Sequence, residues 1–284
     1  MATRISRKLE YDDRFALQQA DQAIRKDVIR ALVELVTNCN DSYHRLEDAG
    51  VKVNGLIAIE VLSKRENSLI RIRDFAEGMN GEQMQSAVGT YGGATSGFSD
   101  GRSVRGMWGR GLKDAIYGLG HGHVHSIQDG QFYDATLSIK NGIPTFDLEV
   151  PVRATRGIRT QYGISSGNGT VIEIVVSRPD VSVPQFDNIR RYMERHFELR
   201  EIVGSPLRQV LLRKLDGHYN LKEEVQLTYK PPVGTLVLDE VIRVPDTSAD
   251  IHLEVFRSNE PLSTPAEERD TADGGLLVIS CHVQ

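Results

Sequence analysis

Three glycines come immediately before a predicted helix in the stretch VRGMWGRGLKDAIYGLG, residues 104–120. Gly106, Gly109 and Gly111 precede residues 112–119, whose apolar side chains recur at helical spacing. Glycine is costly in regular structure because it loses the most backbone freedom on folding, so the cluster indicates that a ligand approaches the backbone closely. Backbone N–H groups at the start of a helix favour anions, and we therefore expect a phosphate there.

Length and composition place the chain among ordinary globular proteins. Its 284 residues exceed the usual size of one domain, and 39% hydrophobic and 26% charged residues give no sign of disorder. A net charge of -5 argues against a globally basic nucleic-acid binder. Cys39 and Cys281 form no CxxC pair and have no spacing suited to a metal, which argues against a disulfide framework or a zinc site. Because no apolar run has the length of a signal-peptide core or a membrane span, we expect a cytoplasmic protein without membrane contact.

The hydrophobic pattern predicts an α+β fold, with helices packed on one face of a mainly antiparallel sheet. Helices are predicted over residues 18–48, 81–88, 112–119 and 185–201, and strands over 56–62, 68–74, 122–128, 132–139, 145–150 and 170–176. Residues 89–105 are rich in Gly, Ser and Thr, which predicts a long mobile loop. The arginines at 190, 191, 195 and 200 are expected on a solvated helix face.

The character of the chain changes after Gly204. Short strands are predicted over residues 208–215, 224–230, 234–244, 251–257 and 275–280, separated by polar or proline-containing breaks. We therefore expect a first domain of residues 1–225 and an incomplete, strand-rich extension of residues 226–284.

Polar residues share one face of the first predicted helix. Glu34, Asn38 and Asp41 lie at positions i, i+4 and i+7, while Leu32 and Leu35 belong to the opposite side. Any one of them alone would be an ordinary solvated residue. Asn has poor helix propensity, however, and a stripe selected only for solubility would favour Lys and Glu. The pattern favours a polar site on this face.

Two further motifs accompany strands. In IRDFAEGMN, residues 72–80, a strand ends at Asp74, whose carboxylate can accept a hydrogen bond from an exocyclic amine. Gly78 would allow a flat ring to lie against the backbone. In GNGTVIEI, residues 167–174, Gly169 and Thr170 enter another strand. Each motif alone is common in turns, but the four motifs together, in this order, are far more specific.

The ordered set resembles the GHKL ATPases, the superfamily of gyrase, the heat-shock chaperone of ninety kilodaltons, histidine kinases and MutL. The resemblance covers residues from about 14 to 225 and is strongest to the MutL and MORC-like branch. It implies a two-layer sandwich of helices on a mainly antiparallel sheet, followed by the start of a transducer-like domain. It also implies an ATPase that uses ATP and Mg2+ and that switches conformation or dimerises with its nucleotide.

The resemblance assigns roles to individual residues. Glu34 matches the general base that polarises the attacking water, and Asn38 matches the magnesium ligand that also contacts the nucleotide. Asp41 would support the nucleotide side of the same helix. The adenine-reading aspartate corresponds to Asp74, and the base-lining and assisting residues correspond to Gly78, Met79 and Thr170.

On the phosphate side, the loop over residues 89–105 matches the ATP lid. The nucleotide-binding residues implied there and in the following segment are Thr95, Ser96, Gly106, Trp108, Gly109, Arg110, Gly111, Leu112 and Lys113. Lys113 is placed as in the MORC-like branch to meet a phosphate oxygen, and a solvated helix lysine is the alternative.

The chain departs from the family pattern at several positions. Ala76, followed by Glu77, stands two positions after the aspartate where the family has Gly, which puts the tightness of the base pocket in doubt. Gly97 replaces the lysine of a MutL lid motif, for which Arg102 or Arg105 could substitute. No residue is identified as the lysine or arginine that the second domain supplies in hydrolysing members.

Two alternatives stay open at this point. A histidine kinase would place its phosphoacceptor helix before the nucleotide domain, whereas His196, in HFELREIVGSPL, follows all four motifs. A nucleotide-gated interaction module that binds ATP with little turnover is compatible with Ala76 and Gly97, although Glu34 in register with Asn38 argues for hydrolysis. The expected partners are ATP, a second copy of the chain in a nucleotide-dependent homodimer, and a DNA or protein client.

Overall fold

The computed structural model describes residues 15–89, 111–230, 234–243, 250–258 and 277–283. They belong to two compact units. The first contains the described residues up to Glu194 and Glu198–Thr228, and the second contains Arg195–Phe197 and the described residues from Tyr229 onward. The fold is α+β, as the sequence pattern predicts.

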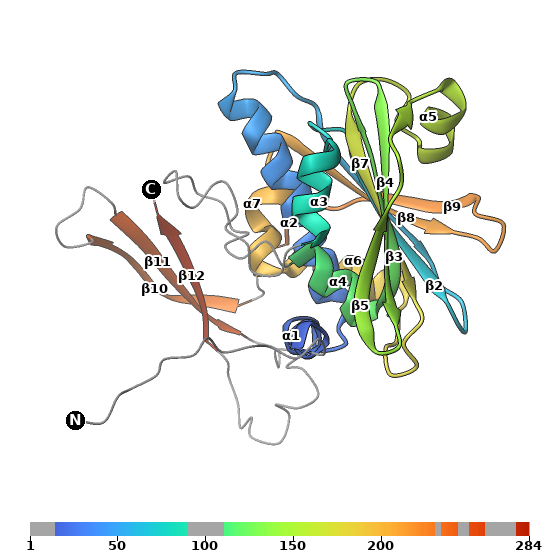
Figure 1. The fold of residues 1–284 in the computed structure, drawn as a ribbon. Helices are drawn as coiled ribbons and strands as arrows, with labels where there is room; N and C mark the ends of the chain where they lie inside the picture. The colour runs from blue at the N-terminus through green and yellow to red at the C-terminus, as the bar shows by residue number, and fades with distance from the viewer. Residues whose placement is uncertain (1–14, 90–110, 231–233, 244–249, 259–276, 284) are drawn as a thin grey trace, which may run out of the picture. The chain divides into compact units, whose positions relative to one another are not determined.

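A mixed, mostly antiparallel sheet of nine strands forms the first unit (Figure 1). Its order is β5-β4-β3-β7-β2-β1-β8-β9, with β6 paired to β4, and only β1 and β8 are parallel neighbours. The strands are β1 (Gly55–Leu62), β2 (Ser68–Asp74), β3 (Gly120–Gln128), β4 (Gln131–Lys140), β5 (Ile143–Leu148), β6 (Val152–Arg153), β7 (Gly169–Val176), β8 (Arg208–Leu215) and β9 (Leu221–Gln226). The predicted hairpin of β1 and β2 is confirmed, with Leu62 opposite Leu69.

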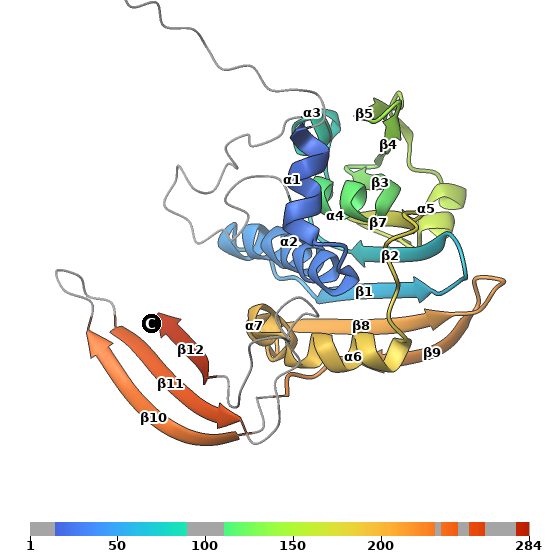
Figure 2. The same ribbon diagram turned by 90° about the horizontal axis from the view of Figure 1, so that it is seen from below.

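Most helices lie on one face of this sheet (Figures 1 and 2). They are α1 (Phe15–Ile24), α2 (Val28–Asp48), α3 (Gly81–Gly89), α4 (Gly111–Leu119), α6 (Phe186–Arg195) and α7 (Arg200–Val203). Helix α2 contacts β1 and β2, whereas α4 contacts β3 and β7 and also packs against α1 and α2. The core between the two layers consists of aliphatic side chains such as Leu32, Leu35, Ile57, Ile72 and Ile116.

The prediction of one helix over residues 18–48 is wrong, because the chain turns between α1 and α2. Arg25 and Lys26 have φ values of 53° and 60°, which a right-handed helix cannot contain. Asp27 then starts α2 by accepting a hydrogen bond from the N–H of Ile29 at 2.8 Å. The predicted helix over 185–201 is likewise interrupted, since α6 ends at Arg195 and a 3₁₀ turn over Phe197–Leu199 precedes α7.

A short helix that the sequence pattern did not predict, α5 (Arg156–Tyr162), covers part of the other face of the sheet (Figure 1). Thr155 caps its first turn, and Gly163 ends it with a φ of 66°. Ile158 and Tyr162 of this helix pack against Ile127 and Phe132 of the sheet. The sequence predicted that all helices pack on one face of the sheet, and α5 shows that this prediction is wrong for one helix.

The second unit contains an antiparallel sheet of β10 (Gly234–Arg243), β11 (Asp250–Ser258) and β12 (Leu277–Val283) in that order. In neither unit do the described residues include a helix that is both long and apolar enough to cross a membrane.

Candidate functional site

Helix α2 carries the first group of predicted site residues on its less buried side. Glu34 is exposed and Asn38 and Asp41 are partly buried, whereas Leu32 and Leu35 are buried on the core side. The polar face that the spacing predicts is therefore present. Residues four apart on a helix are neighbours, so Glu34 and Asn38 lie one above the other.

Asp74 occupies the end of β2 and is almost completely buried, with 5% of its surface exposed. Its Oδ1 accepts hydrogen bonds from the N–H groups of Ala76 at 3.0 Å and Thr170 at 3.2 Å. Burial raises the pKa of this carboxyl to about 6, although both N–H donors act in the opposite direction. A buried carboxylate that retains its charge at neutral pH is suited to recognising a polar ligand group.

Cys39 and Tyr43, which the sequence analysis did not assign to the site, connect α2 to this carboxylate. The buried thiol of Cys39 hydrogen-bonds to Asp74, and burial followed by the charge of Asp74 raises the pKa of the thiol. The Tyr43 hydroxyl donates to the carbonyl of Leu56 at 2.5 Å and accepts from the N–H of Phe75 at 2.9 Å. Both contacts hold the end of β2 against the helix. The signal available in the sequence was the four-residue spacing of Cys39 and Tyr43, which places both side chains on one face of α2.

Gly78 and Met79 form a turn that packs closely against β3. Gly78 has a φ of 69°, and a Cβ there would clash with the carbonyl oxygen of Ile127, so this position requires glycine. The Met79 N–H donates to Ser126 Oγ at 2.6 Å, and that hydroxyl donates to the carbonyl of Gly169 at 3.3 Å. Ser126, which sequence reasoning missed, thus connects the predicted base-lining turn to β7.

Thr170 is brought to Asp74 by the strand pairing. It lies opposite Ser126 in the register of β3 and β7, and it is 7% exposed. The approach of β7 to β2 is close, because a Cβ on Gly169 would lie 2.5 Å from the carbonyl oxygen of Asp74. The predicted adenine-side residues Asp74, Gly78, Met79 and Thr170 are therefore neighbours, although almost a hundred residues separate Asp74 from Thr170 in sequence.

Gly111, the first residue of α4, lies against the predicted general base. A Cβ at Gly111 would clash with Oε2 of Glu34, so the carboxylate occupies space that only glycine leaves free at the start of this helix. Although the side chain remains accessible to solvent, partial burial raises the pKa of Glu34, as do the negative charges of Glu198, Asp114 and Asp41. A raised pKa moves a carboxylate toward the range in which it acts as a general base.

Lys113 is 1% exposed, so the alternative of a solvated helix lysine is wrong. Its Nζ donates to the carbonyl of Ala87, in the last turn of α3, at 2.5 Å. Burial lowers the pKa of this ammonium to about 8. A cation is favoured at a helix C-terminus, and this contact joins α3 to α4. A phosphate contact for Lys113 stays a prediction.

Glu77, beside the turn of Gly78 and Met79, is held by α2. Its carboxylate accepts from Arg45 Nε at 2.6 Å and from Ser42 Oγ at 3.3 Å. Ala76, where the family pattern has glycine, is 4% exposed and packs inside the turn. The acidic side chain is thus directed to α2 by an ion pair rather than left without a partner.

Several predicted nucleotide contacts lie outside the described residues. These are Thr95, Ser96, Gly106, Trp108, Gly109 and Arg110, together with the rest of the predicted lid and its Gly97, Arg102 and Arg105. Leu112, the second residue of α4, is described and partly buried.

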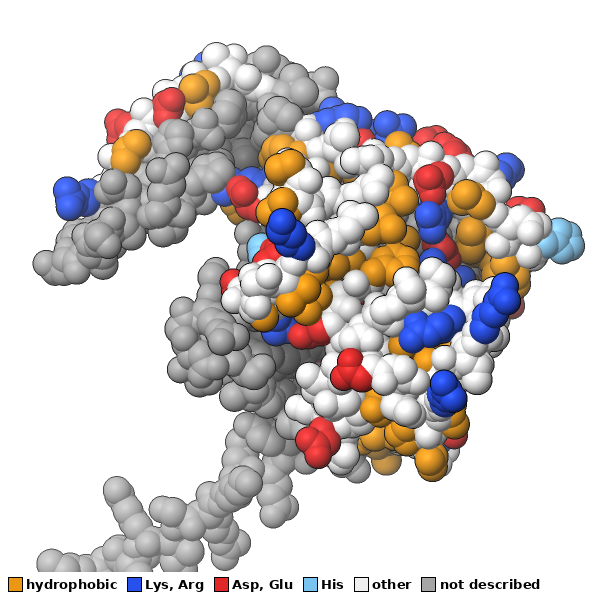
Figure 3. Space-filling model, turned by 90° about the horizontal axis from the view of Figure 1, so that it is seen from above, with side chains coloured by type: hydrophobic (Ala, Val, Ile, Leu, Met, Phe, Trp, Pro, Cys, Tyr) orange, Lys and Arg blue, Asp and Glu red, His pale blue; other side chains and the backbone are white. Residues whose placement is uncertain are grey.

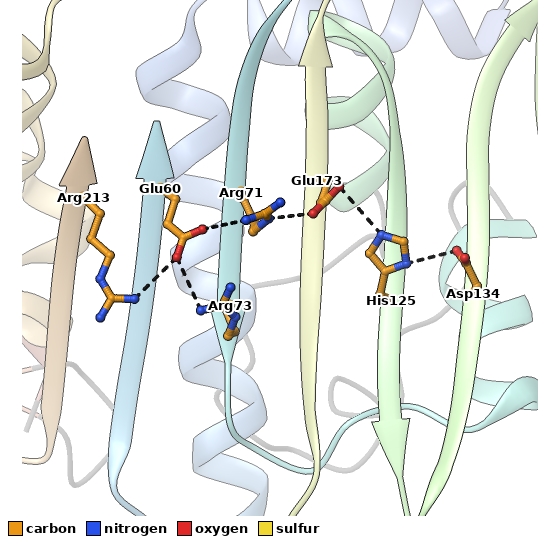
Figure 4. Close-up of polar contacts among 7 residues, drawn as sticks. All are labelled: Glu60, Arg71, Arg73, His125, Asp134, Glu173 and Arg213. Carbon is orange, nitrogen blue, oxygen red and sulfur yellow. Dashed lines mark hydrogen bonds and ion pairs between the residues drawn. The ribbon is translucent and has the colours of Figure 1, made fainter. Parts of the chain in front are cut away.

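A second polar cluster lies on the sheet face opposite α2 and α4 (Figure 4). A row of polar side chains crosses six adjacent strands there, β8, β1, β2, β7, β3 and β4, and the histidine on β3 connects it to an aspartate on β4. The row consists of Arg213, Glu60, Arg71, Glu173, His125 and Asp134, with Arg73 attached to Glu60. We refer to these seven residues as the charged row.

Comparison with known proteins adds no assignment to these two clusters. No protein-family model matches the chain, and no curated protein matches its sequence. The chemistry must therefore be inferred from the residues that the fold brings together.

Proposed function

We propose that this chain is an ATP-binding and ATP-hydrolysing module of the GHKL type, most similar to the MutL and MORC-like branch, and that nucleotide drives its conformation or dimerisation. One observation carries the proposal. Helix α2 contacts both halves of the predicted site, since Cys39 reaches Asp74 and Glu34 reaches Gly111. The two-layer arrangement, with this helix between the sheet and the start of α4, supports the GHKL sandwich.

The adenine side is supported by the character of Asp74. The amine of adenine donates hydrogen bonds, whereas guanine has an accepting carbonyl oxygen at the equivalent position. Asp74 would accept from that amine, and the turn at Gly78 and Met79 would line the ring. Because a buried acceptor left opposite another acceptor is costly, this arrangement would favour ATP over GTP.

The phosphate side is supported by the start of α4 and by the oxygen donors of α2. Backbone N–H groups at the first turn of α4 would hold phosphate oxygens. The amide oxygen of Asn38 suits Mg2+, which prefers oxygen ligands, and the ion would neutralise phosphate charge when bound. Glu34, adjacent to Gly111, would accept the proton of the attacking water. Asp41, one turn beyond Asn38, would add negative charge on the same side.

Three arginines of α6 and α7 contact neighbouring polar side chains, which does not favour DNA as the client. Arg190 pairs with Glu194, Arg200 pairs with Glu201, and Arg191 donates to Asn188. Acidic and basic side chains are intermingled on the face of the molecule shown in Figure 3. DNA binding depends on clustered cations that replace counterions along the phosphate backbone. The expectation that these four arginines share one solvated helix face is wrong, because Arg191 and Arg195 are exposed on α6 whereas Arg200 begins α7 and its side chain is only 12% exposed.

Nucleotide binding is tested with ATP and Mg2+ in a thermal-unfolding assay. A ligand that binds only the folded state stabilises it by mass action, so ATP should raise the melting temperature and GTP should raise it less. Asp74→Asn should abolish the ATP effect, whereas Asp48→Asn, at the exposed end of α2, should keep it. Equal shifts with ATP and GTP that survive Asp74→Asn would contradict the adenine assignment.

Hydrolysis is tested by measuring affinity and steady-state turnover in the same variants. Glu34→Ala should retain ATP binding and lose about 10²- to 10⁴-fold in rate, the usual contribution of a general base. Asn38→Ala should instead weaken binding of MgATP. Asp48→Ala, a second carboxylate of α2, is the matched control and should change neither quantity.

Dimerisation is tested by the molar mass of the particle in solution. It should increase from monomer to dimer when ATP is added, and it should stay at the dimer value in Glu34→Ala, which would hold ATP without cleaving it. Tight ATP binding without turnover in both wild type and Glu34→Ala would favour the nucleotide-gated interaction module. Absence of ATP binding would reject the nucleotide proposal altogether.

A further inference from the structure

One end of the charged row contains two imidazoles and a carboxylate close together. His123 and His125 are two residues apart in β3, so their side chains share the sheet face opposite α2 and α4. Asp134 lies directly opposite His125 in the pairing of β3 with β4. One potential ligand atom from each of these three residues lies within 4.8 Å of the other two.

The two facing polar atoms at this point are buried and form an ion pair but no hydrogen bond of good geometry. His125 Nδ1 and Asp134 Oδ1 lie 3.2 Å apart, and the His125 side chain is 6% exposed (Figure 4). Among the described residues, neither atom makes a hydrogen bond of good geometry, and the ion pair is their contact with each other. A bound cation would give both atoms a partner of good geometry, so the pair is a site that a cation would stabilise.

Neighbouring groups hold the imidazoles in place. The ring of Tyr162 in α5 lies 4.2 Å from that of His125, and the rings of His123 and His125 are stacked at 5.5 Å. His123 Nδ1 lies 3.1 Å from Thr136 Oγ1. A polar partner on one ring nitrogen fixes the orientation of a metal-binding imidazole and leaves the other nitrogen for the metal.

The carboxylates around His125 supply the negative charge that a cation needs. Glu173 Oε2 is 3.9 Å from His125 Nε2, on the side away from Asp134, and Glu173 is itself paired with Arg71. A proton on His125, which would form ion pairs with the two carboxylates, is the alternative to a metal ion. The two alternatives can be distinguished, because a metal ion would need His123 as a ligand whereas the ion pairs of His125 do not involve His123.

We propose that His123, His125 and Asp134 form a binding site for a late first-row divalent cation, with Zn2+ as the probe. Two imidazole nitrogens and a carboxylate oxygen are donors that Zn2+ accepts, whereas Mg2+ prefers oxygen ligands alone. The site is separate from the nucleotide-site residues, because it lies on the other face of the sheet. Zn–ligand bonds of about 2 Å would need the three side chains to move slightly closer together.

The test is a Zn2+ titration of the nucleotide-free full chain against a chromophoric chelator. Wild type should bind one Zn2+, and His123→Asn should weaken that site by tenfold or more. His123 is partly exposed, so this variant should fold. His121→Asn is the matched control, since His121 lies on the same strand and same face, contacts Ser177 and is outside the ligand group; its affinity should equal that of wild type.

Two further measurements make the result decisive. Asp134→Asn, which keeps the size of the side chain, should also weaken Zn2+ binding, and Zn2+ should raise the melting temperature of wild type and His121→Asn but not of His123→Asn. Stoichiometric Co2+ should produce a visible absorption band that His123→Asn removes. Absence of a stoichiometric Zn2+ site, or equal losses in His121→Asn and His123→Asn, would overturn the proposal. ATP is absent throughout, so neither outcome depends on the proposed ATPase.

Discussion

At the scale of single residues, the buried carboxylate of Asp74 lowers the free energy of unfolding when it is charged. Its pKa is about 6 in the folded protein and 3.8 for an ordinary aspartate, so the folded state binds the proton more tightly. Between these two pH values the folded state holds more protons than the unfolded state, and the free energy of unfolding falls as pH rises. Above about pH 6 the full penalty of the buried charge is present.

Asp74→Asn should therefore stabilise the nucleotide-free protein at neutral pH, even though it should abolish ATP binding. The asparagine Oδ1 can still accept from Ala76 and Thr170. The gain over wild type should increase between about pH 4 and pH 6.5 and reach at most roughly 3 kcal/mol, which corresponds to about two pKa units. Urea unfolding over this pH range measures it, with Asp48→Asn as the exposed control. A gain that is independent of pH would show that the Asp74 carboxyl does not titrate as described.

At the scale of an element, α4 contains two glycines that meet different neighbours. A Cβ at Gly111 would meet the flexible end of Glu34, whereas a Cβ at Gly118 would lie 2.9 Å from Cβ and Cγ1 of Ile24 in α1. The first neighbour can rotate away, but the second belongs to the contact between α1 and α4. The two positions therefore separate the contact with the proposed base from helix packing.

Gly111→Ala should change the free energy of unfolding by less than about 1 kcal/mol, because alanine favours the helix while Glu34 moves aside. ATP turnover should nevertheless fall, since the displaced carboxylate is the proposed base. Gly118→Ala should show the reverse pattern, a loss of roughly 1–3 kcal/mol from overpacking with Glu34 undisturbed. Urea unfolding and turnover of the folded variants distinguish the two. Normal turnover in a folded Gly111→Ala protein would contradict the importance of this contact.

At the scale of the whole first unit, Arg208 of β8 secures the helix that carries the proposed catalytic residues. Its side chain is 1% exposed, and its two terminal nitrogens donate to Glu47 of α2 at 2.6 and 2.9 Å. Its Nε donates to Asn40 Oδ1 at 2.7 Å, and its guanidinium lies 5.2 Å from the ring of Tyr43. One side chain thus holds α2 against a strand residue that comes 161 positions later in the chain.

Arg208→Met should reduce the free energy of unfolding by about 3 kcal/mol, because removing one member of a buried ion pair leaves its partner uncompensated. Glu47 is 25% exposed and can be partly rehydrated, which places the loss at the lower end of the usual range. Arg45→Met removes the more exposed pair with Glu77 and should cost less than about 1 kcal/mol. Urea unfolding gives both values, and equal losses would contradict the role of burial.

The sequence by itself determined the local elements and the identity of the polar groups. Alternation of apolar side chains predicted β1, β2, β3, β4 and β7, and helical spacing placed Glu34 and Asn38 on one face of α2. These features depend on residues only a few positions apart. The turn at Arg25 and Lys26 was missed although Asp27 is a good N-cap, because an uninterrupted helical spacing was given more weight. Helix α5 was missed because its seven residues are too few to establish a period.

Only the tertiary structure decided which of these groups meet. Cys39 contacts Asp74 because α2 packs on β2, and Glu34 meets Gly111 because α4 begins beside α2. The charged row exists because β4, β3, β7, β2, β1 and β8 are neighbours in that order, although the chain visits them in another order. A local pattern fixes the face to which a side chain points, but strand order and helix packing are set by burial of the whole core. Contacts across the sheet therefore follow from the complete fold and not from any one segment.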